Sequence, residues 1–361
     1  MKIPLHDFLS EMIQSRGSDL LLASGFPPAI RVYGRLESTA MPPLQNRDVV
    51  DLLQEIVLPQ EYDRIRDQMN LDFAYEGSIP GVGRCRFRCN AYLQRNGMSV
   101  VFRMIPWEAP RLQDLGLPEV LSTLTRHRNG LVLVTGPTGS GKTSTLAAMC
   151  RHINETRPVH VITIEDPIEY VHRDDRAILV QRQVGVHVES FQRALRAALR
   201  EDPDVIVVGE MRDLETMQLA ITAAETGHLV MATLHTVSAS QTISRIVSSF
   251  PSGQQWQVRA MMADSLRAVI SQQLLPKMNG AGRIPAVELL LNSEAVANLI
   301  REDKLFQIPG VVESSASKGM RLMDQDLIRL VSEGLVEPTE ALDRAHDKLD
   351  FSTRVEFRKK V

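Results

Sequence analysis

The feature that most constrains this chain is the stretch G-P-T-G-S-G-K-T at positions 136 to 143. It fits the phosphate-binding pattern G-x-x-x-x-G-K-S/T, in which glycines let backbone N–H groups close on phosphate oxygens. In this pattern Lys142 brings a positive charge to the β- and γ-phosphates, and Thr143 holds magnesium. We therefore expect a nucleoside triphosphate site. The residues expected to contact the nucleotide are Gly136, Pro137, Thr138, Gly139, Ser140, Gly141, Lys142, Thr143 and Ser144.

The sequence around this loop supports the prediction. Residues 130 to 135 predict a buried parallel strand that runs into the loop. Residues 143 to 153 predict a helix whose N-terminus adds its dipole to the anion site. The alternative is a glycine-rich turn that binds nothing, but such a turn has no need of Lys142 and Thr143 at a helix start.

Composition narrows the class of protein. A chain of 361 residues with 43% hydrophobic residues has material for two or three globular domains. Its net charge of −3 and pI near 6.3 argue against a nucleic-acid partner. Its three cysteines, Cys85, Cys89 and Cys150, form no even disulfide framework, which favours a reducing, cytoplasmic compartment. We expect no transmembrane segment, because no apolar run approaches the roughly 18 residues that a bilayer requires.

The first part of the chain, residues 1 to 105, predicts a small α+β domain. Helices are expected at 8 to 16, 46 to 57 and 59 to 69, and strands at 19 to 24, 29 to 33, 71 to 76, 84 to 93 and 98 to 105. In the strand from 84 to 93, alternation places Cys85, Phe87, Cys89, Ala91 and Leu93 on the packed face and Arg84, Arg86, Arg88, Asn90 and Tyr92 on the other.

A row of arginines marks this domain. Arginines stand at 84, 86, 88, 95 and 103, and no acidic residue lies between 84 and 103 to neutralise them. A solvated strand face normally mixes signs, so an uncompensated row indicates an anion that arrives from elsewhere. The alternative is a self-contained basic face.

Beyond this domain the pattern changes. Residues 106 to 118 carry three prolines, at 106, 110 and 118, and predict a linker. Residues 119 to 275 alternate short β-branched strands with helices, which predicts a doubly wound α/β core with a parallel sheet. Its strands are expected at 131 to 135, 160 to 164, 204 to 208 and 229 to 234. From about 252 the chain is expected to be mostly helical. The region 276 to 361 would hold a strand near 284 to 291 and helices near 293 to 301, 305 to 314, 323 to 333 and 338 to 346.

Polar residues follow the predicted core strands. Glu165 to Glu169 follow the second strand, Gly209 to Asp213 the third, and His235 with Thr236 the fourth. Ligands of an open parallel sheet bind outside the carboxyl ends of its strands. One carboxylate to hold magnesium, one to activate water and one sensor of the γ-phosphate would complete a phosphoryl-transfer site.

Each of these residues also has a structural alternative. Glu165 and Asp166 could cap the next segment, Glu210 could pair with Arg212, and His235 could be a satisfied hydrogen-bonding group.

These motifs together resemble a known family. The chain is similar to the secretion-type hexameric ATPases and, within them, to type IV pilus retraction ATPases of the PilT and PilU kind. The matching segments are the loop 136 to 143, the aspartate box 162 to 170, the Walker B signature 199 to 213, the histidine box 226 to 236, and the shorter matches 17 to 20 and 298 to 302.

The resemblance implies a fold and an activity. The fold would be a RecA-like P-loop core with a helical C-terminal tail, preceded by a PAS-like N-terminal domain. The activity would be hydrolysis of ATP with Mg²⁺ by a homohexameric ring on the cytoplasmic face of the inner membrane, powering pilus retraction and twitching motility. The implied partners are a platform protein of that membrane and, as a further possibility, a paralogous retraction ATPase.

The resemblance also implies roles for residues. Thr143 and Glu210 would hold magnesium, Glu169 would be the general base, and His235 would sense the γ-phosphate, with the roles of Glu169 and Glu210 open to exchange. A ring also offers the arginine row its anion, the γ-phosphate on the adjacent subunit. Arg88 and Arg103 are the preferred pair for this role in trans.

Two departures leave alternatives open. The Walker B strand ends in Gly209-Glu210 instead of an aspartate, which shifts the magnesium role to Glu210. In the tail, Ala297 stands beside Asn298 where retraction-type relatives carry an arginine. An accessory ring subunit with weak hydrolysis therefore remains an alternative, as does an ATPase of pilus assembly or type II secretion. The charged run 301 to 304 leads us to expect that the tail faces the membrane machinery.

Overall fold

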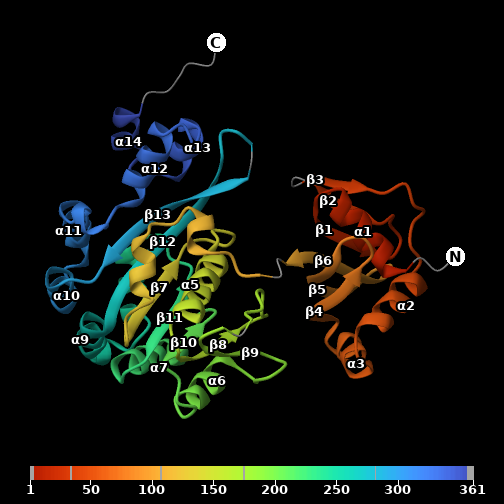
Figure 1. Cartoon of the computed structure of the whole chain (residues 1–361), viewed down its shortest axis with the longest axis horizontal. Helices are drawn as coiled ribbons and strands as arrows, with labels where there is room; N and C mark the ends of the chain where they lie inside the picture. The colour runs from red at the N-terminus through yellow and green to blue at the C-terminus, as the bar shows by residue number, and fades with distance from the viewer. Residues whose placement is uncertain (1–3, 33–34, 106–107, 174, 281, 356–361) are drawn as a thin grey trace. The chain divides into compact units, whose positions relative to one another are not determined.

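The structure, a computed structural model, describes residues 4–32, 35–105, 108–173, 175–280 and 282–355 (Figure 1). It divides into two compact units. The first comprises Met1–Glu108 with Pro167–Val171, and the second comprises Ala109–Asp166 with His172–Val361. Among the described residues, no helix is both long and apolar enough to span a bilayer.

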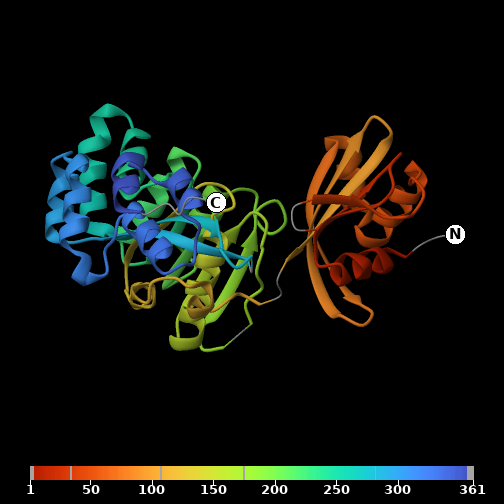
Figure 2. The same cartoon turned by 90° about the horizontal axis from the view of Figure 1, so that it is seen from above.

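The first unit is a six-stranded antiparallel sheet with three helices. Its elements are α1 (Leu5–Gln14), β1 (Gly17–Ala23), β2 (Ala29–Val32), β3 (Arg35–Ser38), α2 (Asn46–Ile56), α3 (Pro59–Gln68), β4 (Asn70–Ile79), β5 (Gly83–Gln94) and β6 (Gly97–Ile105). The strand order is β3-β2-β1-β6-β5-β4. Figure 2 shows the red helices gathered on one side of the orange sheet. The predicted helices and strands of this unit are present, and the short strand β3 adds to them. Tyr33, in the predicted strand 29 to 33, lies outside the described residues.

The alternation predicted for β5 holds at its centre, and two residues depart from the expected exposure. Phe87, Cys89 and Ala91 are buried in the core beneath the helices. Leu93, expected on the packed face, is exposed near the strand end. Arg86, expected on the arginine face, is only 5% exposed, and its Nε lies 3.3 Å from Oε1 of Glu76 on the neighbouring strand.

The second unit is built on a seven-stranded sheet. Its strands are β7 (Gly130–Thr135), β8 (His160–Glu165), β9 (Ile178–Gln183), β10 (Val205–Val208), β11 (Leu229–Leu234), β12 (Leu266–Pro276) and β13 (Arg283–Leu291). The strand order is β13-β12-β7-β11-β10-β8-β9. All neighbouring pairs are parallel except β12 with β13. The four predicted core strands are present within a residue or two of their expected bounds, and the α/β fold with a parallel sheet is confirmed.

Helices cover both faces of this sheet. They are α4 (Val120–Leu124), α5 (Lys142–Thr156), α6 (Phe191–Ala198), α7 (Leu214–Glu225), α8 (Ala239–Ser248), α9 (Gln255–Ser265), α10 (Glu294–Arg301), α11 (Ile308–Ser314), α12 (Met323–Ser332), α13 (Pro338–Arg344) and α14 (Lys348–Arg354), with short 3₁₀ turns at Leu112–Leu115, Ser252–Gln254, Leu305–Gln307 and Ala316–Lys318. The tail helices match the predicted ones closely.

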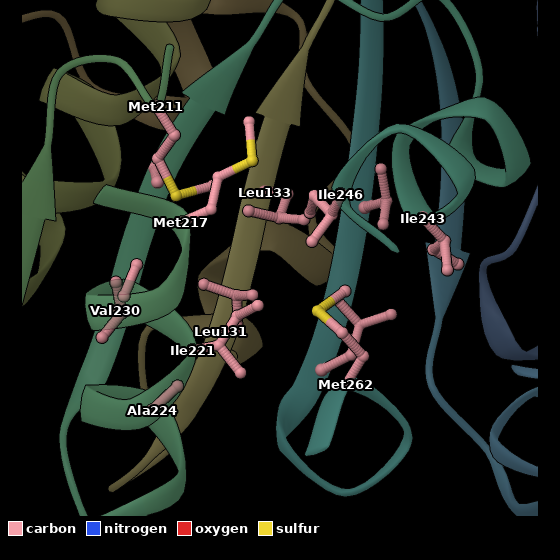
Figure 3. Packing of buried hydrophobic residues seen from close by; sticks show 14 of the residues in the cluster. Leu131, Leu133, Met211, Met217, Ile221, Ala224, Val230, Ile243, Ile246 and Met262 are labelled. Atoms are coloured by element: carbon pink, nitrogen blue, oxygen red, sulfur yellow. The ribbon is translucent and has the colours of Figure 1, made fainter. Parts of the chain in front are cut away.

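Apolar residues alternate between two cores across the sheet. In β7, Leu131 and Leu133 pack into one core, and Val132 and Val134 into the other. Figure 3 shows the first of these cores, where Met217 and Ile221 of α7 and Met262 of α9 meet β7 and β11. A strand buried on both faces is apolar throughout, which explains why β7 and β11 carry uninterrupted hydrophobic runs.

Two strands of this sheet were not predicted, β9 and β12. The region after 252 was expected to be helical up to the strand near 284, but β12 occupies Leu266–Pro276 and lies between β7 and β13. Leucine, alanine and glutamine favour helix locally, and pairing on both sides outweighs that preference here. The domain boundary predicted at 275/276 falls inside this sheet, because β13 pairs with β12 along its length.

Candidate active site

The phosphate loop joins β7 to α5. Gly136, Gly139 and Gly141 all have positive φ angles, of 140°, 80° and 90°, which glycine adopts at little cost. Pro137 to Gly139 form an exposed tip, whereas Ser140 and Lys142 are buried beneath it. Strand, loop and helix thus follow one another in the order that the sequence predicted.

Lys142 is held by the loop itself. Its Nζ donates hydrogen bonds to the carbonyl oxygens of Gly136 and Pro137, at 2.8 and 2.9 Å. Burial lowers the pKa of Lys142, and the carboxylate of Glu210 opposes this shift. An ammonium group directed to the loop mouth from the start of a helix is suited to bind phosphate oxygens.

Glu210 and His235 meet beyond two neighbouring strands. The Glu210 Oε1 atom lies 2.7 Å from His235 Nε2, and its Oε2 atom lies 2.8 Å from Arg212 Nη2. The parallel register Val208↔Ala232 brings the ends of β10 and β11 level, so both side chains lie at the same edge of the sheet. The structure therefore brings together two residues predicted for the site, and it confirms the pairing of Glu210 with Arg212.

These contacts set the charge of Glu210. Burial alone raises its pKa, but hydrogen bonds and charge from Arg212 and His235 outweigh burial, so the pKa is lowered. Glu210 is therefore an anion at neutral pH. An ionised oxygen ligand held at the end of β10 is what a hard cation beside a nucleotide requires.

Two other acids predicted near the strand ends have structural partners. Glu165 Oε1 accepts hydrogen bonds from Thr163 Oγ1 at 2.6 Å and from Gln181 Nε2 at 3.0 Å. Asp213 caps α7, because its two carboxylate oxygens accept from the backbone N–H and the hydroxyl of Thr216, both at 2.9 Å.

Magnesium fits the residues at this site. Among the residues that the structure describes, no three His, Cys, Asp or Glu side chains converge to form a metal cage. Mg²⁺ beside a nucleotide needs no such cage, since it takes one or two protein oxygens together with phosphate oxygens. The exposed hydroxyl of Thr143 and the ionised carboxylate of Glu210 supply oxygens of this kind.

Arginines of the row are ion-paired with acidic residues that lie outside the segment from 84 to 103. Arg84 and Arg86 lie 3.2 and 3.3 Å from Glu76 oxygens, and Arg103 Nε lies 2.7 Å from Asp19 Oδ1. The expectation that this row is uncompensated is wrong. Antiparallel pairing sets Glu76 opposite Arg86 and Asp19 opposite Arg103, so the neutralising acids come from β4 and β1.

Arg88 and Glu169 lie together in the first unit. Arg88 Nη1 is 3.5 Å from Glu169 Oε1, and both side chains keep about a third of their surface exposed. The predicted base and one predicted trans arginine are therefore ion-paired with each other in this chain. Their catalytic roles remain predictions.

Sequence reasoning missed the residues of β12 that contact the loop. Gln272 is 3% exposed and hydrogen-bonds to both the loop and α5, and the Ser271 hydroxyl lies 2.8 Å from that of Thr135. These partners are more than 120 positions away in the chain, so no local motif marks them.

Comparison with known proteins shows the family to which the chain belongs. The family model described as "Type II/IV secretion system protein" matches residues 29–334. The chain is 45% identical over 339 residues to the type IV pilus retraction ATPase PilT of Pseudomonas aeruginosa, covering 94% of this chain and 97% of the relative. It is 37% identical to the type IV pilus ATPase PilU of the same organism over 346 residues, covering 96% and 90%.

A solved structure is similar along almost the whole chain. The crystal structure of the pilus retraction motor PilT with bound ADP superposes with a TM-score of 0.89 at 43% identity, covering 97% of this chain and 99% of that one. The predicted family resemblance is confirmed.

Proposed function

This chain belongs to the family of type II/IV secretion system proteins, and from that premise we propose that it hydrolyses ATP as a subunit of a homohexameric motor that retracts type IV pili. The proposal is carried by the arrangement of charged side chains at one edge of the second unit's sheet. There Lys142 lies at the base of a phosphate loop, and an ionised Glu210 is fixed between His235 and Arg212.

The predicted site residues divide the work of phosphoryl transfer. Lys142 and the loop amides bind the phosphates and orient the γ-phosphate for in-line attack. His235, which is hydrogen-bonded to Glu210, senses the γ-phosphate and passes the signal to the segment that follows β11. Glu169 takes the proton of the attacking water. Arg88 and Arg103 stabilise the transition-state charge on the adjacent subunit.

Magnesium would be held by Thr143 and Glu210. When bound, it neutralises charge on the β- and γ-phosphate oxygens. The carboxylate of Glu210 needs no proton loss to serve as a ligand, because its lowered pKa keeps it ionised.

Force is passed on to a platform protein of the inner membrane through the helical tail. Leu299 packs against the main core, and Arg301 of α10 bonds to Asp264 of α9 at 2.6 Å. Two exposed aromatic side chains, Trp256 and Phe306, lie on α9 and on the turn after α10. The four charged residues 301 to 304 are ion-paired within the chain, and the two exposed aromatic side chains meet the partner.

The first experiment is steady-state ATP hydrolysis with Lys142→Ala as the inactive control. A retraction motor hydrolyses ATP in the wild type and loses hydrolysis in the variant. A wild-type ring that assembles but hydrolyses little would instead mark an accessory subunit. The greater identity to PilT than to PilU favours the main motor.

The second experiment is a deletion strain scored for surface pili and twitching motility, complemented with the wild-type or Lys142→Ala gene. Pili retained without motility support retraction. Absent pili would identify an assembly motor and overturn the proposal.

A further inference from the structure

Gln272 of β12 contacts the phosphate loop and the helix that follows it. Its Nε2 donates to the carbonyl oxygen of Ser140 at 2.7 Å, and its Oε1 accepts from the hydroxyl of Thr145 at 2.8 Å. A carbonyl oxygen can only accept, so the amide nitrogen must face Ser140 and the amide oxygen must face Thr145. Both ends of the buried amide are satisfied in a single orientation.

The bond to Ser140 fixes the plane of one peptide group. In a trans peptide the C=O and the following N–H point in opposite directions. Because the Ser140 carbonyl is held by Gln272, the Gly141 N–H is directed away from Gln272. Backbone N–H groups of this loop are the donors that bind phosphate oxygens.

The glycines of the motif show how closely β12 approaches. A Cβ atom at Gly141 would lie 2.8 Å from Gln272 Nε2, and one at Gly136 would collide with the Gln272 backbone carbonyl. The same residue therefore touches both ends of the loop. A side chain at Gly136 would therefore collide with the β12 backbone, and one at Gly141 would meet the amide of Gln272.

The strand that carries Gln272 is itself firmly held. β12 pairs with β7 on one side and β13 on the other. Directly opposite Gln272 stands Val287, whose N–H is bonded to the buried carboxylate of Asp326 in α12 at 2.9 Å. A side chain acts as a rigid support when its own backbone is fixed in this way.

We propose that Gln272 is a positioning residue for nucleotide binding, which holds the Ser140–Gly141 peptide in the orientation that presents its N–H to the phosphates. This rests on the proposed function, since it assigns a role within the same phosphate site. The residue acts through the loop and does not itself contact the reacting atoms.

The test is Gln272→Met, which keeps an unbranched side chain of similar length and removes both hydrogen bonds. The matched control is Gln273→Met, the same change at the next residue of β12, whose side chain points to the opposite face of the sheet. ADP affinity is measured by calorimetry, and KM and kcat are measured for ATP.

We expect Gln272→Met to raise the ADP Kd and the ATP KM about tenfold, the order expected for one lost hydrogen bond to a charged group. We expect kcat of Gln272→Met to stay within about threefold of wild type. The Gln273→Met control should match wild type in the ADP Kd, the ATP KM and kcat. An unchanged Kd and KM, or a fall in kcat with KM unchanged, overturns the inference.

A second variant, Thr145→Val, tests the inference if Gln272→Met folds poorly. Thr145→Val removes only the bond that orients the amide, so the same rise in Kd and KM is expected at a smaller, two- to fivefold level. Values equal to wild type overturn the inference there too. Failure of wild-type protein to bind ADP would instead defeat the proposed function, so the two failures are distinguishable.

Discussion

The two units use charged residues in different ways. In the first unit, arginines and acids on neighbouring strands of an antiparallel sheet neutralise each other, as Glu76 does with Arg84 and Arg86. In the second unit, Glu210 lies beyond the ends of parallel strands, where one carboxylate is shared between Arg212 and His235. Charge along a strand is balanced by the neighbouring strand, whereas charge at a strand end remains available to a ligand.

The contrast between the two units would fail if an ion-paired arginine of the first unit had a catalytic role. Arg88 is the best candidate, because its ion pair at 3.5 Å is the longest of those that hold Arg84, Arg86, Arg88 and Arg103, whereas Arg86 is buried. We expect Arg88→Ala to lower hydrolysis about a thousandfold, as for an arginine that acts on a neighbour's γ-phosphate.

Mixed rings separate action in trans from damage to the subunit. Rings that combine Arg88→Ala subunits with Lys142→Ala subunits should regain part of the wild-type rate, because some interfaces join an intact arginine to an intact phosphate loop. Arg84→Ala is the matched control and should leave hydrolysis near wild type. Absence of recovery in rings shown to be mixed would leave Arg88 as an ordinary ion-pair residue.

A somewhat smaller loss of hydrolysis rate is expected on changing Glu210, at the end of β10. Glu210→Gln should lower kcat about a hundredfold, because the amide is a poorer magnesium ligand and no longer balances Arg212 and His235. Raising magnesium should restore part of the rate if Glu210 is the ligand. Single-turnover hydrolysis measured over a range of magnesium concentrations up to saturation tests this.

Glu169→Gln is the comparison variant. If Glu169 is the base, its loss of rate persists at every magnesium concentration. A Glu169→Gln variant that magnesium rescues, beside a Glu210→Gln variant that it does not, would exchange the two roles.

The sequence predicted the site motifs of the second unit better than it predicted the ion pairs of the first unit. The reason is physical. The phosphate loop and the residues after β10 and β11 are contiguous motifs, and parallel packing brings the strand ends together. The partners of the arginines come from strands that are distant in sequence, as Asp19 and Arg103 illustrate at a separation of 84 positions. Pairing of this kind depends on the order β1-β6-β5-β4, which the strand patterns do not specify.

Gln272 illustrates the same limit within the site. Its strand has the composition of a helix, so neither β12 nor the amide that holds the loop could be found from local preference. The predicted domain boundaries and the catalytic roles of Glu169, Arg88 and Arg103 likewise depend on contacts that no single segment encodes, and they stay predictions.

Ion pairs of the first unit should affect stability more than activity. Asp19 is nearly buried and accepts from Ser18 and Arg103 at 2.7 Å each, so Asp19→Ala should lower the free energy of unfolding by about 2 kcal/mol. Arg84→Ala, at the exposed end of the pair with Glu76, should cost less than about 1 kcal/mol. Urea unfolding measures both, and equal losses would contradict the role of burial.

The smallest effect is expected for Asp213, a second-unit carboxylate that serves local structure. As the N-cap of α7 it should contribute about 1 kcal/mol, lost in Asp213→Ala and largely kept in Asp213→Asn. Burial raises the pKa of Asp213, but hydrogen bonds from Thr216 and its neighbours outweigh burial and lower it. A carboxyl whose pKa is lower in the folded state adds stability above its unfolded pKa, near 3.9, and loses it as the pH falls through the folded value. The difference in unfolding free energy between wild type and Asp213→Ala should therefore be constant from pH 7 to about pH 5 and shrink below about pH 4. A difference that does not change with pH would show that the cap does not depend on the charge, and a large loss of hydrolysis in Asp213→Asn would place Asp213 with Glu210 among the residues that serve the ligand.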